Sequence, residues 1–166
     1  RSAVSNAEGM NGVMQFVPDS DKITTYDGRV QHFKDLGWLE EGFNEEPDLA
    51  MQRGTLSKIL AHALDIDGGV MMRLTNKAGR YAQRELIYMQ IMPASTPQQA
   101  IGGLEYIGVI QKAQDYKLLR EMDDAAKEAA KNGAPASEPA KSEEGKRGEE
   151  PEAPPAKEQP GLPTPG

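Results

Sequence analysis

The fold class of this chain is decided by the stretch TLSKILAHAL, residues 55–64. Its apolar side chains, counted from Leu56 to Leu64, recur at positions i, i+3, i+4, i+7 and i+8, which lie on one face of a helix. Gly68-Gly69 lies just beyond, where helices commonly end. The stretch therefore predicts an amphipathic helix with one buried face.

A second helical pattern covers residues 96–131. Thr96 can cap a helix, Pro97 suits the first turn and Gln99 suits the third position. Residues 123–131 are rich in Ala, Glu and Lys, as in a solvated helix, and Asn132-Gly133 ends the pattern. We therefore expect a long helix whose apolar stripe consists of Leu104, Tyr106, Val109, Ile110, Ala113, Leu118, Leu119 and Met122.

The preceding residues predict two shorter helices and an extended segment. Arg29–Leu39 and Arg80–Met92 are moderately amphipathic and are expected to be helical. Residues 12–26 surround the turn-forming Pro18-Asp19-Ser20-Asp21 and are expected to be extended, as a hairpin or a strap. Residues 1–25 are accordingly assigned to an extended N-terminal segment.

The sequence repeats itself at a shift of 50 residues. This shift brings Lys34-Asp35-Leu36 onto Arg84-Glu85-Leu86, and it superposes Leu56, Ile59, Leu60 and Ala63 on Tyr106, Val109, Ile110 and Ala113. Two amphipathic helices can also agree at one offset by chance. We predict a mainly α fold in which two helix-loop-helix repeats, at about 26–67 and 76–116, pack as a small bundle within a helical domain of residues 26–131.

Composition excludes several classes of function. The 166 residues include no cysteine and two histidines, so disulfides, thiolate metal sites and a catalytic zinc or Ser-His-Asp site are not expected. The formal charge of −7 disfavours nucleic-acid binding. No stretch approaches the 20 or so apolar residues that span a bilayer. We expect no cofactor, no metal and no enzymatic activity.

The composition changes near residue 132. Residues 132–166 contain eight of the twelve prolines and one large aliphatic side chain, Leu162. Such a segment buries too little apolar surface to offset its ordering entropy. We predict a disordered Pro/Glu-rich C-terminal tail or spacer; the alternative is that it folds onto a partner.

Two stretches resemble an S-layer homology repeat: FKDLGWLEEGF at residues 33–43 and MQRGTLSKILA at residues 51–61. In that family a short helix ends in a Leu-Gly turn, a glycine-containing loop follows, and a Thr-Arg-Ala-Glu-like start opens the next helix. The resemblance implies a helical bundle that anchors bacterial surface proteins non-covalently to cell-wall polymers. It covers residues 26 to 116.

The chain departs from the family at the helix starts. Gln52-Arg53-Gly54-Thr55 and Gly102-Gly103-Leu104-Glu105 stand where the family has Thr-Arg-Ala-Glu, so that Arg53 and Glu105 remain, one per block. Two repeats replace the family's usual three. The resemblance therefore implies the framework more strongly than the polymer-binding groove.

A basic run offers a candidate binding face. Arg73, Lys77, Arg80 and Arg84 fall within twelve residues, and Arg80 and Arg84 lie one helical turn apart. They predict docking of an anionic glycan, a lipid headgroup or an acidic protein surface; the alternative is that internal ion pairs occupy them. If the ligand is a glycan, Arg53 contacts its anionic groups and Trp38 or Tyr81 stacks on its sugars.

Other candidate residues have plainer interpretations. His32 and His62 are expected to be structural, because neither has a second histidine within a helical turn. Asp65-Ile66-Asp67-Gly68-Gly69 lacks the further ligands of a calcium loop, and Asp19-Ser20-Asp21 suits a turn. The cluster Met71, Met72, Met89 and Met92 suits either a core or an adaptable docking surface.

Gly102-Gly103 and Gly108 interrupt a helical pattern, where each costs about 1 kcal/mol relative to Ala. Close helix packing, a kink, or a partner's backbone passing nearby can offset that cost.

Two functions remain. The first is a non-enzymatic structural or adaptor protein of a bacterial cell-envelope assembly, which docks other proteins through Arg and Met surfaces. The second is a module that binds cell-wall polysaccharide. The first is preferred because the ligand motif is incomplete while the helical framework is intact. The chain starts at Arg1, which suits a mature periplasmic or surface protein after signal removal; a trimmed chain looks the same.

Overall fold

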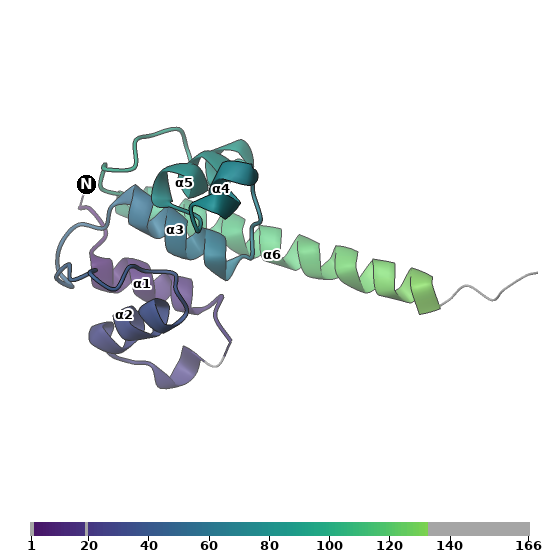
Figure 1. The fold of residues 1–166 in the computed structure, drawn as a ribbon, viewed down its shortest axis with the longest axis horizontal. Helices are drawn as coiled ribbons and strands as arrows, with labels where there is room; N and C mark the ends of the chain where they lie inside the picture. The colour runs from purple at the N-terminus through teal and green to yellow at the C-terminus, as the bar shows by residue number, and fades with distance from the viewer. Residues whose placement is uncertain (1, 19, 133–166) are drawn as a thin grey trace, which may run out of the picture. The chain divides into compact units, whose positions relative to one another are not determined.

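A computed structural model describes residues 2–18 and 20–132, and it is mainly α, as predicted. The elements are α1 (Asn6–Met14), a 3-10 turn η1 (Ser20–Lys22), α2 (Tyr26–Asp35), α3 (Arg53–Ala63), α4 (Val70–Leu74), α5 (Gly79–Tyr88) and α6 (Gly103–Asn132) (Figure 1). The predicted tail lies, apart from Asn132, outside the described residues.

Three buried residues, each two positions before a helix, form a ring at the centre. The Met51 N–H donates to the Val4 carbonyl (2.8 Å), the Val4 N–H to the Ile101 carbonyl (2.9 Å) and the Ile101 N–H to the Met51 carbonyl (3.1 Å). Isolated antiparallel bridges flank this ring at Ala3–Gly102, Ser5–Ala50 and Gln52–Ala100. The helix starts of α1, α3 and α6 are therefore equivalent positions of one three-fold pattern.

The third helix start corrects two expectations. Residues 1–25 are not an extended segment, because α1 occupies residues 6–14. A reciprocal cap opens this helix: the Ser5 hydroxyl accepts from the Glu8 N–H, and Glu8 accepts from the Ser5 N–H. The fold accordingly contains three related helix starts, at Ser5, Gln52 and Gly102, rather than the two that the 50-residue shift predicts.

The predicted helix start at Thr96 is wrong. The Gln99 side chain does accept a hydrogen bond from the Thr96 N–H (3.2 Å), as in a cap, but residues 96–99 form a single turn. The chain then extends through Ala100 and Ile101, which the central ring needs, and α6 begins at Gly103.

The two short helices align in a register different from the predicted one. At the end of α2, the N–H groups of Trp38 and Leu39 donate to the Phe33 carbonyl, and at the end of α5 those of Ile91 and Met92 donate to the Leu86 carbonyl. Phe33 and Leu86 are both fully buried, whereas Leu36 is 44% exposed. The short helices therefore correspond at a shift of 53, because the loop after α2 is three residues longer; the additional short helix α4 was not predicted.

Helices α3 and α5 approach each other closely at two glycines. A Cβ added to Gly79, in the first turn of α5, would lie 2.6 Å from the Gly54 carbonyl oxygen. Pro97 covers the other side of Gly54, at 3.1 Å from the place of its absent Cβ. These glycines let the α3 and α5 backbones approach, and α3 and α5 form the most extensive helix pair of the bundle.

Three cations attach α6 to the ends of the other helices. Lys112 donates to the Gln90 carbonyl after α5 (2.8 Å), Lys117 to the Phe16 carbonyl after α1 (3.5 Å), and Arg120 to the Leu64 and Asp65 carbonyls after α3 (2.9 and 2.8 Å). Side-chain donors here satisfy carbonyls left open at helix C-termini, where positive charge is favourable. Beyond Arg120 the helix projects from the body (Figure 1). Residues 121–131 are exposed.

In the described part of the chain, none of the helices combines the length and the apolar character required for a transmembrane span.

Candidate binding site

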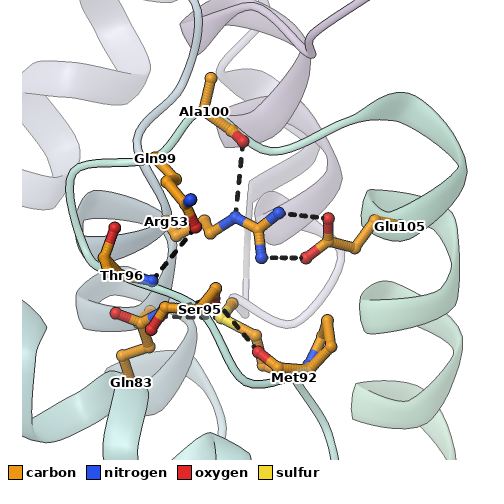
Figure 2. A network of polar contacts seen from close by, with 10 residues as sticks. Arg53, Gln83, Met92, Ser95, Thr96, Gln99, Ala100 and Glu105 are labelled. Carbon is orange, nitrogen blue, oxygen red and sulfur yellow. Dashed lines mark hydrogen bonds and ion pairs between the residues drawn. The ribbon is translucent and has the colours of Figure 1, made fainter. Parts of the chain in front are cut away.

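Arg53 and Glu105, the two residues that remain of the family-like helix starts, bind each other. The ion pair is bidentate, with Nη1–Oε1 and Nη2–Oε2 both 2.5 Å, and Arg53 Nε also donates to the Ala100 carbonyl at 3.4 Å (Figure 2). The side chains are 13% and 23% exposed. Because Glu105 and Ala100 occupy the guanidinium, Arg53 joins the start of α3 to the start of α6.

Trp38 is engaged inside the protein as well. Its ring stacks with Phe33 at 5.6 Å and with His62 at 5.7 Å between centroids, at interplanar angles of 15° and 11°. Burial, assisted by the positive charge of Lys77, lowers the pKa of His62 to about 4, so this imidazole is neutral at pH 7. Tyr81 is half-buried and packs against the core. The structure therefore does not present these aromatic residues together on one open surface with Arg53.

Arg80 and Arg84 do lie together, on the exposed face of α5. With Gln83 and Ile87 of the same helix and Ser95, Thr96, Pro97 and Gln98 of the following loop, they line an open groove of about 440 Å³, which we call the basic groove. Among the described residues no carboxylate forms an ion pair with either guanidinium. Both charges are thus available to an anionic group.

The loop wall of the basic groove is held by a buried amide. Gln83 is 2% exposed, and its Nε2 donates to the Ser95 hydroxyl (2.8 Å) and to the Ser95 carbonyl (3.2 Å) (Figure 2). The Ser95 hydroxyl in turn donates to the Pro93 carbonyl at 3.1 Å. The wall is preorganised, since a ligand would not need to order this loop.

The equivalent groove on α2 carries the opposite charge. At the shift of 53, Asp27 and Gln31 of α2 occupy the places of Arg80 and Arg84. Glu45 and Glu46 line the loop side, and with Asp27 they outnumber the one cation of this lining, Lys34. The corresponding helix and loop at α2 thus have no arginine at either position.

Arg73 and the methionines fall outside the basic groove. Arg73, on α4, is 67% exposed and lies 4.0 Å from Asp67. Met72 and Met92 are buried in the core, while Met71 joins Val70 and Leu74 in an exposed apolar surface on α4; these three are 50%, 81% and 77% exposed. Met72 and Met92 thus fit the predicted core role, whereas Met71 lies on a surface, which is the other role that the sequence allowed for the methionine cluster.

No group of three or more His, Cys, Asp or Glu residues that could hold a metal ion occurs within residues 2–18 and 20–132. Asp65, in the calcium-like stretch, pairs with Arg120 at 3.0 Å. Asp19 lies outside the described residues.

Sequence reasoning missed the loop side of the groove, Ser95 to Gln98, because Thr96-Pro97 also suits a helix start. It missed α1 as well, although Ser5 followed three residues later by Glu8 is a recognised helix-start signal. Compared with protein-family models, with curated proteins and with solved structures, the chain matches none.

Proposed function

We propose that this chain is a non-enzymatic docking module, a structural or adaptor protein of a bacterial cell-envelope assembly that holds an acidic surface of another protein in its basic groove. The observation that carries the proposal is that Arg80 and Arg84 line one groove without a carboxylate partner among the described residues. The corresponding positions on α2 are Asp27 and Gln31, so the arginines distinguish this groove from its equivalent. Arginine is well suited to carboxylates because its planar fork can bind them through two hydrogen bonds.

The non-enzymatic part of the proposal is supported by the environment of the histidines. His62 is a neutral ring stacked on Trp38, and His32 lies against Phe33 with centroids 6.3 Å apart. Among the described residues, the contacts of both imidazoles are packing contacts with aromatic rings.

The S-layer homology resemblance belongs to the proposal too. The helix start revealed by the three-fold pattern reads Ser5-Asn6-Ala7-Glu8, which resembles Thr-Arg-Ala-Glu at three of four positions if Ser is taken for Thr. A family-like unit of three helix starts would fit an envelope location for this chain.

A cell-wall polysaccharide is the second candidate ligand, because anionic glycans can also bind to Arg80 and Arg84. It is less favoured, since Arg53 is paired with Glu105 and Trp38 is stacked between protein rings. The remaining groove lining offers no aromatic side chain on which a sugar could stack.

The experiment is affinity isolation of the full chain from envelope extract, before and after enzymatic digestion of the cell-wall sacculi. We expect one protein at a fixed stoichiometry by native mass spectrometry, retained after digestion and lost in Arg80→Glu/Arg84→Glu. The control Lys127→Glu/Lys131→Glu makes the same charge change on the exposed end of α6 and should keep the partner. Retention on purified sacculi that digestion abolishes would instead establish the polysaccharide reading.

A further inference from the structure

The basic groove belongs to a row of three open grooves on one continuous surface. A middle groove of about 440 Å³ lies between the loop after α2 and the starts of α3 and α5, and it shares Pro97 and Gln98 with the basic groove. The groove on α2, of about 430 Å³, shares Phe43, Asn44 and Glu45 with the middle groove, and we call it the acidic groove. The shared residues form the ridges between neighbouring grooves.

The two ends of this surface carry opposite charges. Arg80 and Arg84 line the basic end, whose lining includes no carboxylate. Three carboxylates line the acidic end, against the one cation Lys34: those of Asp27, Glu45 and Glu46. Within residues 2–18 and 20–132, none of the charged side chains at either end takes part in an ion pair. Each end therefore lacks, inside the chain, the countercharge that the other end carries.

The middle of the surface is nearly neutral and partly apolar. Lys58 binds Glu40 there at 3.5 Å, so these two charges offset each other. The apolar side chains of the middle groove are those of Leu39, Phe43 and Pro97. Protein interfaces typically have such a centre, with the charged residues toward the rim. The three grooves together are lined by a number of residues similar to the 20–30 or so that each side of a standard interface contributes.

We propose that a second copy of this chain docks on this surface, in a two-fold dimer that places the acidic end of each copy on the basic end of the other. A two-fold axis through the middle of the surface reverses its direction in the second copy, so both pairs of opposite ends meet in one arrangement. The ridge at residues 43–45 then enters the basic groove of the other copy, and the ridge at residues 97–98 enters its middle groove. The second copy supplies the countercharges that each end lacks.

This inference rests on the proposed function, because both require the basic groove to bind carboxylates. A second copy occupies the groove until an acidic partner of the assembly displaces it. Arg80, Arg84, Asp27 and Glu46 are exposed, so their pairing across the dimer is screened by salt. We therefore expect a weak dimer that dissociates as the ionic strength rises.

The test is analytical ultracentrifugation of the full chain at concentrations up to about 1 mM. We expect a monomer–dimer equilibrium whose dissociation constant rises about tenfold or more between low salt and about 0.5 M salt. Arg80→Glu/Arg84→Glu and Asp27→Lys/Glu46→Lys should each abolish the dimer when measured alone, because like charges then meet at both contacts. An equimolar mixture of the two variants should dimerise again, because each contact then joins opposite charges.

Two control variants make the same changes of charge elsewhere. Lys127→Glu/Lys131→Glu and Glu121→Lys/Asp123→Lys lie on the exposed end of α6 and should leave the dissociation constant of the dimer unchanged. Circular dichroism of each variant verifies its helical fold, and recovery of the dimer in the mixture requires that both reversed variants are folded.

Three results would overturn the inference: a monomer at every concentration, an oligomer larger than a dimer, or no dimer in the mixture of the two reversed variants. The proposed function is judged separately. A monomeric chain that still retains an envelope protein through Arg80 and Arg84 would contradict only the dimer, whereas a dimeric chain that retains no envelope protein would contradict only the proposed function.

Discussion

Arg53 joins two helix starts, because its backbone belongs to the start of α3 while its guanidinium binds at the start of α6. Its backbone N–H bonds to the Gln99 carbonyl, while its side chain binds Ala100 and Glu105 (Figure 2). The helix-start carboxylate of α1, Glu8, instead turns back to cap its own helix through Ser5. Equivalent carboxylates therefore serve different partners because Arg53 is available to one of them.

This difference predicts unequal costs for the same substitution. Glu105→Gln leaves the mostly buried Arg53 without its countercharge and should lower the free energy of unfolding by about 2 kcal/mol. Glu8→Gln keeps a capping acceptor on an exposed side chain and should cost clearly less than Glu105→Gln. Urea unfolding of both variants beside the wild type measures the difference, and equal costs would contradict the role assigned to Arg53.

His62 makes stability depend on pH. Burial lowers its pKa from 6.5 to about 4, with contributions from Lys77 and Lys58, so in that interval the unfolded chain binds a proton that the folded chain does not. The free energy of unfolding should therefore fall as the pH falls from about 7 to 5, by about 1 kcal/mol after allowing for the half-buried position. His62→Phe keeps a ring against Trp38 and should show a smaller fall in its urea midpoint; parallel pH profiles would refute the assignment.

At the residue scale, the sequence identified unusual residues more readily than the residues that they contact. It identified Arg53, Trp38 and the Arg80–Arg84 pair as unusual, but it assigned Arg53 and Trp38 to a ligand. Their partners, Glu105 and His62, lie 52 and 24 positions away in the chain, and no local spacing encodes such a contact. The proximity of Arg80 and Arg84 was easier to predict, because residues four apart lie on the same face of a helix.

At the scale of elements, the spacing of apolar residues correctly predicted α3 and the body of α6. It placed the start of α6 too early, at Thr96. The pattern of Leu56, Ile59 and Leu60 is local and was read directly. The extended residues before α3 and α6 depend on the central ring, which joins residues far apart, so the local cap at Thr96 predicted a helix that the ring prevents. Alpha-helical periodicity carries no information about such a ring.

Two glycines on neighbouring elements should respond oppositely to alanine. Gly79→Ala pushes a methyl group against the Gly54 backbone, which cannot move without separating α3 from α5. We expect a loss of about 2 kcal/mol or more in the free energy of unfolding. The measurement is thermal and urea unfolding, and a variant as stable as the wild type would show that this contact is not tight.

Gly108→Ala should stabilise the protein. Gly108 lies inside α6, and an added Cβ meets no atom within 4 Å. Alanine there removes the conformational cost of glycine in a helix, worth up to about 1 kcal/mol. An increase in the urea midpoint without a change in slope is expected; a decrease would reveal a close neighbour at this position.

For the described molecule as a whole, α6 closes the bundle and then leaves it. Tyr106 donates to the Gly9 carbonyl at its start, and Lys112, Lys117 and Arg120 hold the ends of α5, α1 and α3. The Asp65 carboxylate raises the pKa of Arg120 further. Arg120 is therefore the last residue of α6 for which a hydrogen bond to the rest of the bundle is described. The helix itself continues beyond it.

This arrangement predicts where the chain can be shortened. Residues 121–131 are exposed, and the ion pair recorded there, Lys127 with Asp124, is internal to the helix. A chain ending at Ala125 keeps every described contact between α6 and the body, so its melting temperature should fall by no more than about 3 °C. A chain ending at Tyr116 keeps this aromatic ring against the core but loses Lys117 and Arg120. It leaves the carbonyls after α1 and α3 without these donors and should lose about 2 kcal/mol or more. Differential scanning calorimetry of the two shortened chains distinguishes the cases, and equal melting temperatures would mean that the cations of α6 do not hold the bundle closed.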